Sequence, residues 1–305
     1  MATYHSGEIA VQRRAGLAQQ ADFSLGGIGE TIPPVARDFL AEQPLIVLGG
    51  TDPDGRVWAS QLTGEPGFLK VPDPRTLVVD ALPLPDDPLA GVLTGGPAAR
   101  IGMIAIEPAT RRRMRINGRA HRQDDGLRVD LDQVIANCPK YLQKRNRGRT
   151  GQGGAGAAAP VATDGTELSP AQQRAVREAD TFFVATASDR GDADASHRGG
   201  NPGFVQVLSP TLLRWPDYVG NAMFLTLGNL LLNSSAGILV PDWETGTTLH
   251  LAGSAHTVWD ADEVAEVPGA QRLVEFSVEA VREITAASPL RWSSPDYSRF
   301  NPAVA

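Results

Sequence analysis

The chain has 305 residues, of which 42% are hydrophobic and 21% are charged. This length exceeds one typical domain of about 150 residues, and the composition is that of an ordinary globular protein rather than a disordered or fibrous one. A formal net charge of -7 argues against a protein that wraps a nucleic-acid backbone, because such proteins need clustered basic charge.

The cysteine and histidine content limits the chemistry. A single cysteine, Cys138, excludes an intramolecular disulfide and a multi-thiolate zinc site, and we interpret it as a small buried apolar residue rather than a nucleophile. The histidines show no paired spacing for a metal, so no metal site is expected. The sequence shows no signal-peptide-like segment and no apolar run of membrane-spanning length, which predicts a cytoplasmic protein without membrane contact.

Residues 1–145 predict a helical N-terminal extension, a helix at 34–42 and then a series of short strands. Glycine, proline and aspartate separate these strands, as is typical of turns. Alternation of arginine with apolar residues at 113–116 indicates a strand with one solvated face. The expected strands are at 45–48, 57–60, 68–71, 77–79, 101–104 and 113–116.

Two segments of this first part require a choice between interpretations. Residues 81–98 contain four prolines, and we expect them to prevent a helix, because proline lacks the amide hydrogen and clashes with the preceding turn. The arginine-rich stretch 111–119 is interpreted as a solvated strand edge rather than an anion-binding strip, because neighbouring side chains of a strand point to opposite faces.

A composition change divides the chain. Hydrophobic periodicity stops at 146–166, which is rich in glycine and alanine and predicts a flexible linker before a C-terminal domain at 167–305. This domain begins with a helix at 169–179, where Ser169 and Pro170 form a typical helix start. A segment that is apolar on all sides predicts a buried helix at 224–233. The expected strands are at 182–185, 203–207, 212–215, 237–240 and 248–251.

The two domains are predicted to be copies of one another. Residues 59–68 align with residues 195–204 without a gap, and the alignment continues to Gly118 and Gly253 with a shift of a single residue. Strands this short and regular favour closed or sandwiched antiparallel sheets.

Several motifs in this repeated arrangement carry a resemblance. In the second copy they are SHRGGNPGF at 196–204, GNAMFLTLGN at 220–229 and LHLAGSA at 249–255. In this order they resemble the FMN-binding split barrels of the pyridoxamine 5'-phosphate oxidase-like superfamily. The first copy, with WASQLTGEPGF at 58–68 and NCPKY at 137–141, looks like the tandem-repeat subgroup of that superfamily.

The resemblance implies a mainly β fold of two tandem antiparallel split β-barrels with a few helices. Split barrels of this superfamily pair, with FMN between them, so the two copies are expected to form an internal pair, and a homodimer of chains is a further possibility. FAD and deazaflavin are the alternative cofactors. The cofactor-binding residues that the resemblance indicates are Ser196, His197, Arg198, Gly199, Asn221, Met223, Phe224, Thr226 and Asn229 in the second copy, and Ser60, Gln61, Leu62, Thr63 and Lys140 in the first.

The sequence departs from the superfamily pattern at the expected phosphate contacts. Arg198 is the best phosphate partner, because a guanidinium can bind two oxygens at once. Ala222 and Met223 stand where many members carry arginine or lysine, and Leu62 occupies the position that corresponds to Arg198. We therefore expect one good flavin site rather than two equivalent ones.

The resulting prediction is a flavin-dependent oxidoreductase that acts on a small molecule, with a nicotinamide or quinone as electron partner and no nucleic-acid partner. The flavin would carry the electrons, so no catalytic side chain is assigned. The alternative is a non-catalytic protein that binds flavin or haem, and a third interpretation is a pair of empty barrels that serves assembly only.

Overall fold

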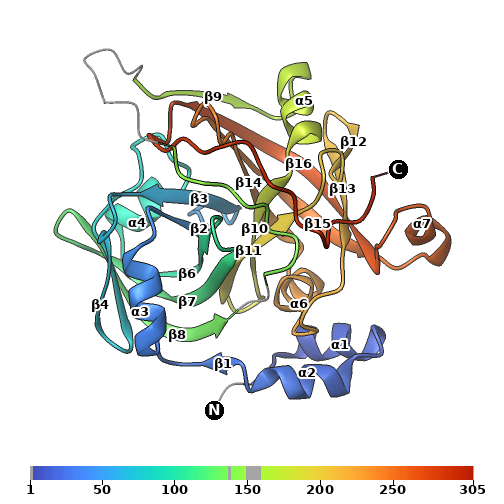
Figure 1. The fold of residues 1–305 in the computed structure, drawn as a ribbon, viewed down its shortest axis with the longest axis horizontal. Coiled ribbons are helices and arrows are strands. Elements are labelled where there is room, and N and C mark those ends of the chain that lie inside the picture. The colour runs from blue at the N-terminus through green and yellow to red at the C-terminus, as the bar shows by residue number, and fades with distance from the viewer. Residues whose placement is uncertain (1–2, 137–138, 149–158, 305) are drawn as a thin grey trace.

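The computed structural model describes residues 3–136, 139–148 and 159–304, and the predictions about Cys138 and the central part of the linker lie outside these ranges. The described chain forms two eight-stranded antiparallel sheets, the first built from the N-terminal half and the second from the C-terminal half (Figure 1). The predicted mainly β fold of two tandem split barrels is confirmed.

The two sheets repeat the same strand order. The first runs β3-β2-β6-β7-β8-β5-β4 with β1 paired to β8, and the second runs β11-β10-β14-β15-β16-β13-β12 with β9 paired to β16. The first sheet comprises β1 (Ile28–Gly29), β2 (Leu45–Thr51), β3 (Val57–Thr63), β4 (Leu69–Asp73), β5 (Thr76–Val79), β6 (Ala99–Glu107), β7 (Arg112–Gln123) and β8 (Gly126–Ala136). The second comprises β9 (Val161–Gly165), β10 (Thr181–Ala187), β11 (Ala193–Gly199), β12 (Gln206–Ser209), β13 (Leu212–Asp217), β14 (Ser235–Pro241), β15 (Thr248–Val258) and β16 (Arg272–Thr285).

Even the irregularities of the two sheets correspond. Strand β7 has a register shift at Gly118, and β15 has one at the aligned Gly253. At both positions an added Cβ would collide with the backbone of the neighbouring strand, which explains why glycine stands there. Strand β9 lies within the interval 146–166 that was expected as a linker, so the last residues of that interval belong to the second sheet.

Seven helices accompany the sheets in the described residues: α1 (Ser6–Arg14), α2 (Ala18–Leu25), α3 (Pro34–Ala41), α4 (Ala90–Gly95), α5 (Pro170–Glu178), α6 (Leu225–Leu232) and α7 (Ala261–Ala265). The predicted helices at 34–42, 169–179 and 224–233 are confirmed by α3, α5 and α6. The prediction that 81–98 lacks a helix is wrong. Its prolines lie before and after α4 and none lies inside it, so they bound the helix and do not break it.

Helix α1 packs on α6 of the second repeat, although it belongs to the N-terminal extension (Figure 1). The two helices approach closely at Gly7 and Gly228, where an added Cβ on either residue would collide with the other helix. His5 caps α1 by accepting hydrogen bonds from the backbone of Gly7 and Glu8. The N-terminal segment is thus tied to the C-terminal barrel.

The two barrels pack directly against each other through β2, β3 and β6 on one side and β10, β11 and β14 on the other. Gly102 on β6 lies against the backbone of Asp194, and Gly237 on β14 lies against the backbone of Trp58, which reproduces the same contact in both directions. An apolar cluster that includes Val47 and Phe183 joins the two sheets. The barrels therefore form a pseudo-symmetric pair within one chain.

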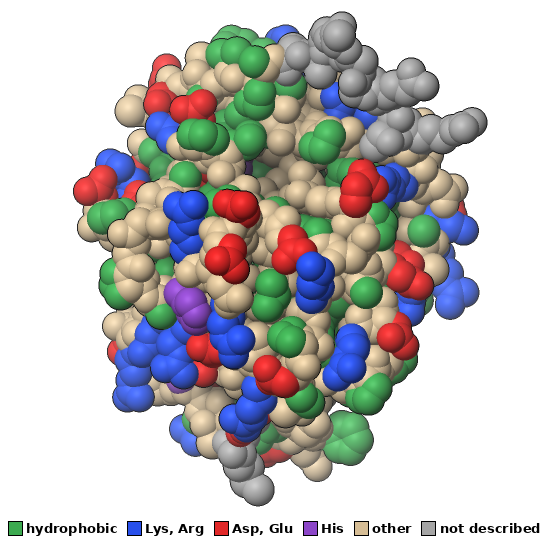
Figure 2. All heavy atoms as spheres, turned by 90° about the vertical axis from the view of Figure 1, so that its left-hand side faces the viewer, with side chains coloured by type: hydrophobic (Ala, Val, Ile, Leu, Met, Phe, Trp, Pro, Cys, Tyr) green, Lys and Arg blue, Asp and Glu red, His purple; other side chains and the backbone are tan. Residues whose placement is uncertain are grey.

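The C-terminal segment after β16 runs back across the molecule (Figure 1). It pairs with the end of the N-terminal repeat through bridges between Lys144 and Asp296 and between Arg147 and Trp292. Acidic and basic side chains are interspersed on the face of the molecule drawn in Figure 2. Among the described helices, none has the length and apolar character needed to cross a membrane.

Candidate functional site

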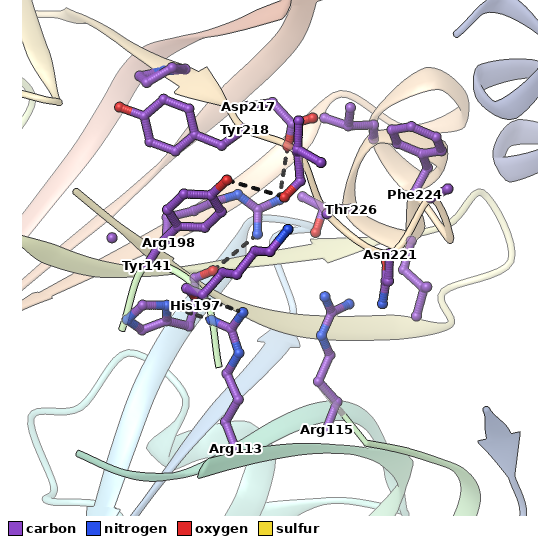
Figure 3. A pocket seen from close by; sticks show the side chains of 18 of the residues that line it. Arg113, Arg115, Tyr141, His197, Arg198, Asp217, Tyr218, Asn221, Phe224 and Thr226 are labelled. Atoms are coloured by element: carbon purple, nitrogen blue, oxygen red, sulfur yellow. Dashed lines mark hydrogen bonds and ion pairs between the residues drawn. The ribbon is translucent and has the colours of Figure 1, made fainter. Parts of the chain in front are cut away.

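A cavity of about 340 Å³ lies where the two repeats meet. Strand β7 and the segment 139–148 of the N-terminal repeat form one wall, and β11, the end of β13 and the start of α6 form the other (Figure 3). Its volume lies within the range of about 300–1,000 Å³ that is typical of small-molecule sites.

Two arginines from β7 line the cavity. Arg113 and Arg115 alternate along the strand, so their side chains lie on the same face and point toward the cavity (Figure 3). Arg115 Nη1 lies 3.2 Å from a carboxylate oxygen of Asp194. The interpretation of these arginines as a solvated strand edge is wrong, because β7 is paired on both sides, with β6 and with β8. Arg112 and Arg119 of the same strand are about half exposed and pair with Glu107 and Asp132.

His197 on β11 is neutral and holds Arg113 in place. Its Nδ1 lies 2.8 Å from Arg113 Nη1, which can only donate, so Nδ1 accepts and the ring proton is on Nε2. Burial lowers the pKa of His197 well below its usual value, and the guanidinium groups of Arg113 and Arg198 lower it further. The ring packs edge-on against Phe183, with 5.7 Å between the ring centres.

Arg198, the next residue of β11, reaches into the cavity from the C-terminal repeat (Figure 3). It donates a hydrogen bond to the backbone carbonyl of His197 and lies 3.9 Å from the carboxylate of Asp217. Its side chain is only 18% exposed, and its Nε has no hydrogen-bond partner in the described part of the chain. Arg198 therefore keeps donor capacity at the cavity.

Asp217 lies between two arginines, because Arg272 Nη1 approaches its other carboxylate oxygen at 3.5 Å. Burial raises the pKa of Asp217, and the guanidinium groups of Arg198 and Arg272 oppose this rise. Burial also lowers the pKa of Arg198. Both ion-pair distances are long for direct hydrogen bonds, so a single carboxylate compensates the two guanidinium groups incompletely.

Aromatic side chains form the rest of the wall. The rings of Tyr141 and Tyr218 lie 5.0 Å apart with a tilt of 35°. Burial raises the pKa of Tyr218 to about 12, so its phenol stays protonated at neutral pH. Phe224 has a left-handed backbone with φ of 59° at the start of α6, and Arg272 stacks on its ring. The cavity thus combines cationic donors with flat apolar surfaces.

The structure brings seven of the predicted residues to this cavity. They are His197, Arg198, Gly199, Asn221, Phe224, Thr226 and Lys140. Lys140 also places its ammonium group 5.7 Å from the centre of the Phe300 ring.

Three predicted residues of the second repeat lie behind or beside the cavity. Ser196 is buried and donates to Asp194 at 2.9 Å. Met223 is buried with its backbone carbonyl accepting from Gln12, and Asn229 bonds to His5 and Thr186. These residues support the site's walls from outside.

The four predicted residues of β3 do not line the cavity. Ser60 is buried and hydrogen-bonds the Asp87 carboxylate, and Leu62 packs in the core of the N-terminal barrel. Gln61 and Thr63 lie on the same strand, away from the cavity. The pseudo-symmetry relates β3 to β11, but β3 packs against β14 and β15, whereas β11 packs against β6 and β7.

Sequence reasoning missed the importance of Arg113, Arg115, Asp217 and Tyr218. The alternation of Arg113 and Arg115 was a usable signal, because two arginines separated by one residue share a face once the strand is known to be central. Asp217 ends β13, and Tyr218 follows it in a loop whose direction depends on tertiary packing.

Comparisons with known proteins agree with this architecture. The sequence model of the family described as "Pyridoxamine 5'-phosphate oxidase" matches residues 168–291, which is most of the C-terminal repeat. No curated protein sequence matches the chain.

Solved structures that resemble the chain cover about two fifths of it at low identity. HupZ from Group A Streptococcus is 12% identical, covering 37% of this chain and 90% of its own, with a TM-score of 0.31. The FAD binding protein from Mycobacterium smegmatis is 15% identical, covering 40% and 98%, with a TM-score of 0.29. A protein from Clostridium acetobutylicum, related to general stress protein 26 and of the pyridoxinephosphate oxidase family, is 12% identical, covering 39% and 89%, with a TM-score of 0.27.

Proposed function

Since this chain belongs, through its C-terminal repeat, to the pyridoxamine 5'-phosphate oxidase-like superfamily of flavin-binding split barrels, we propose that it is a flavin-dependent oxidoreductase that binds FMN between its two repeats. The observation that carries the proposal is the convergence of Arg113, Arg115 and Arg198, from both repeats, on one cavity with aromatic walls. Guanidinium groups bind phosphate oxygens in pairs, and a flat ring needs an apolar slot.

The residues present fit a flavin phosphate. Ala222 and Met223 lack the cation that many members of the superfamily carry after the Gly-Asn turn, but Arg113 and Arg115 supply positive charge from the opposite repeat. The Nε groups of Arg115 and Arg198 are buried and make no hydrogen bond within the described residues. A dianionic group would offset the cost of these buried donors.

The two repeats approach each other closely at the edge of the cavity. Gly199 ends β11 at the cavity, and an added Cβ there would collide with the backbone of Tyr141. The glycine keeps the two repeats in contact and leaves their backbone near the cavity.

A bound flavin would supply the electron-transfer chemistry. The protein's own residues would bind, orient and shield it. The three arginines would hold the phosphate, and neutral His197 would fix Arg113 without adding charge. Tyr218, protonated at neutral pH, can donate a hydrogen bond, and Tyr141 and Phe224 exclude water from the cavity walls.

The proposal also specifies the cofactor and the reaction partners. We propose FMN, with FAD or a deazaflavin as alternatives, a small-molecule substrate, and a nicotinamide or quinone as electron partner, for an enzyme that works in the cytoplasm. Binding of flavin without electron transfer would indicate the non-catalytic alternative. A haem is a poorer fit, because the free ring nitrogen of His197 is protonated and buried.

The test compares two neighbouring arginines of one strand. FMN binding is measured by fluorescence titration for the wild type, for Arg113→Ala and for the control Arg112→Ala. Arg112 is half exposed and pairs with Glu107, so its removal leaves the cavity intact. We expect Arg113→Ala to weaken FMN binding at least about tenfold and Arg112→Ala to leave it unchanged. Equal effects would overturn the site.

Catalysis is tested on the flavin-loaded protein. Nicotinamide and quinol donors are added without oxygen, and the flavin absorbance is followed before and after air is admitted. Bleaching followed by recovery in air supports the oxidoreductase. An absorbance that no donor changes would establish the binding-only alternative instead.

A further inference from the structure

A second and larger cavity, of about 740 Å³, lies beside the first. Helix α1, strands β6 to β8 and the turn between β10 and β11 surround it. Strand β7 contributes to both cavities, because Arg113 and Arg115 line the first and Asn117 lines the second. The ion pair of Arg115 with Asp194 stands between them.

The second cavity is acidic. Six carboxylates but only three guanidinium groups line it; the carboxylates are Glu8, Glu30, Asp132, Asp189, Asp192 and Asp194. Four of the six have arginine partners: Arg100 pairs with Asp192, Arg119 with Asp132, Arg115 with Asp194, and Arg75 with Glu30. This arrangement disfavours a phosphate-bearing ligand, in contrast to the first cavity.

Glu8 is the buried carboxyl that lacks such a partner. It is 6% exposed, and its Oε2 accepts a hydrogen bond of 2.8 Å from the backbone of His5. Within the described chain its only ion-pair contact is with His5 Nε2 at 3.7 Å. His5 is neutral, because its Nδ1 accepts from the backbone and burial lowers the pKa of the ring.

The surroundings of Glu8 oppose its charge. Burial, with a smaller contribution from the Asp194 carboxylate, raises the pKa of Glu8 to about 7, although the hydrogen bond from the His5 backbone and the charge of Arg115 oppose the rise. Tyr4, the other titratable group that faces Glu8, stays protonated because burial and Glu8 raise its pKa to about 12. A positive charge in the cavity would therefore stabilise the ionised form of Glu8.

Asn117 provides an independent sign of a ligand. Its side-chain Nδ2 donates to Gln133 at 3.1 Å, but its Oδ1 is buried and has no hydrogen-bond partner among the described residues. Asn117 is only 8% exposed and lines the cavity. A buried acceptor without a donor costs about 1–3 kcal/mol, which an N–H group of a ligand would offset.

The geometry points to an organic cation rather than a metal ion. No group of three or more His, Cys, Asp or Glu side chains in the described residues is arranged to hold a metal. We propose that the second cavity binds a small organic cation, with Glu8 as its counter-ion and Asn117 Oδ1 as an acceptor for its N–H groups. This site goes beyond the proposed flavin chemistry and does not depend on it.

The test uses the full-length protein and isothermal titration calorimetry. The probe is 1,4-diaminobutane, and the uncharged control is 1,4-butanediol. At pH 8 we expect saturable binding of the diamine and none of the diol. Affinity should fall at least about fivefold at pH 6, because Glu8 then binds a proton that the cation must displace. No saturable binding of the diamine, or equal binding of the diol, would overturn the proposal.

Two variants locate the site. Glu8→Gln keeps the capping box of α1, because glutamine serves there as well as glutamate, but it removes the charge. It should weaken diamine binding about tenfold and abolish the pH dependence. The control Asp132→Asn removes a half-exposed carboxylate that Arg119 already pairs, and it should change affinity less than about twofold.

The proposal remains testable if Glu8→Gln does not fold. Asn117→Ala removes the acceptor and should weaken diamine binding about fivefold while FMN titration shows the first cavity unchanged. Diamine binding that is insensitive to Asn117→Ala and equal at pH 6 and pH 8 would contradict the assignment. Loss of FMN binding with retained diamine binding would instead count against the flavin site alone.

Discussion

The cavity of Arg198 and the corresponding region of the other repeat share one backbone arrangement. They differ in the side chains that this backbone carries. The pair Phe183 and His197 in the second sheet corresponds to Val47 and Gln61 in the first. By the same register, Leu62 takes the place of Arg198. One repeat therefore presents a guanidinium where the other presents an apolar side chain.

The walls that face β11 and β3 also differ between the two regions. Where β7 brings Arg115 toward β11, β15 brings His250 toward β3. His250 Nδ1 donates to the backbone carbonyl of Ala59 at 2.8 Å, and its Nε2 accepts from Thr248. Burial lowers the pKa of His250, so this region holds a neutral, fully bonded side chain where the other holds a cation.

The comparison shows that two copies of a fold can keep the same topology while the side chains at their corresponding sites change. Both sheets keep the same strand order, glycine bulges and mutual contacts, because these depend on apolar alternation and on close backbone approach. The polar groups that would bind an anion remain at only one of the two corresponding places. The molecule is thus expected to hold one flavin.

The largest expected effect is on stability, and it comes from Leu62, the apolar counterpart of Arg198. Leu62 is 2% exposed in the core of the N-terminal barrel, so Leu62→Ala should lower the free energy of unfolding by about 2–5 kcal/mol. FMN affinity of the folded protein should stay at the wild-type value. Urea denaturation and FMN titration measure the two quantities, and a loss of FMN binding by folded Leu62→Ala would break the comparison.

The next effect concerns α1, which covers α6 in the second repeat, whereas no helix of the described residues covers α4 in the same way. The pKa of Glu8 rises from 4.5 in the unfolded chain to about 7 when α1 is packed. The folded protein then binds the proton more tightly, so the contribution of Glu8 is fully present below pH 4.5 and is lost as pH rises toward 7. The loss amounts to at most about 3 kcal/mol.

Comparison of the wild type with Glu8→Gln isolates this effect. Both unfolding free energies are measured by urea denaturation between pH 4.5 and pH 8, and their difference removes the opposite contributions of His5, His197 and His250, whose pKa values are lowered. A difference that does not change with pH would show that Glu8 is not buried under α1.

A smaller effect is expected at Arg198, the charged counterpart of Leu62. Arg198→Ala removes a charge-assisted contact worth about 1.5–3 kcal/mol, so FMN affinity should fall roughly 10- to 150-fold with little change in stability. Fluorescence titration measures the affinity. An Arg198→Ala variant that binds FMN as tightly as the wild type would refute the phosphate assignment.

The smallest effect on FMN binding is expected from a transplanted charge, although a guanidinium buried at position 62 also destabilises the N-terminal barrel. Leu62→Arg places a guanidinium at the position that corresponds to Arg198, but Ala81 and His250 there supply neither the carboxylate nor the second cation. Among variants that fold, the number of FMN molecules per chain should not change. A second bound FMN would show that a single residue separates the two regions.

Much of the fold followed from the sequence because alternation and turn residues act locally. The helix that begins after Ser169 was predictable from its capping residues, and Ser169 indeed accepts from the backbone of Gln172. Helix α4 was missed because the prediction considered the number of prolines and not their positions. Proline at the ends of a helix does not break it.

The site was less predictable than the fold. The SHRGG motif led directly to His197 and Arg198, but the partner that orients His197 comes from β7 of the other repeat, far away in the chain. Local pattern cannot show that β7 is central rather than an edge. Ser60 and Leu62 were included because of the repeat, and their burial shows that corresponding positions do not keep corresponding roles.

The number of flavins bound per chain tests the central claim most directly. The protein is saturated with FMN, unbound FMN is removed, and the released flavin and the protein are quantified separately. One FMN per chain is predicted, because Arg113, Arg115 and Arg198 converge on the first cavity, whereas Leu62 and His250 stand at the places that correspond to Arg198 and Arg115. Two FMN per chain, or none, would contradict the account.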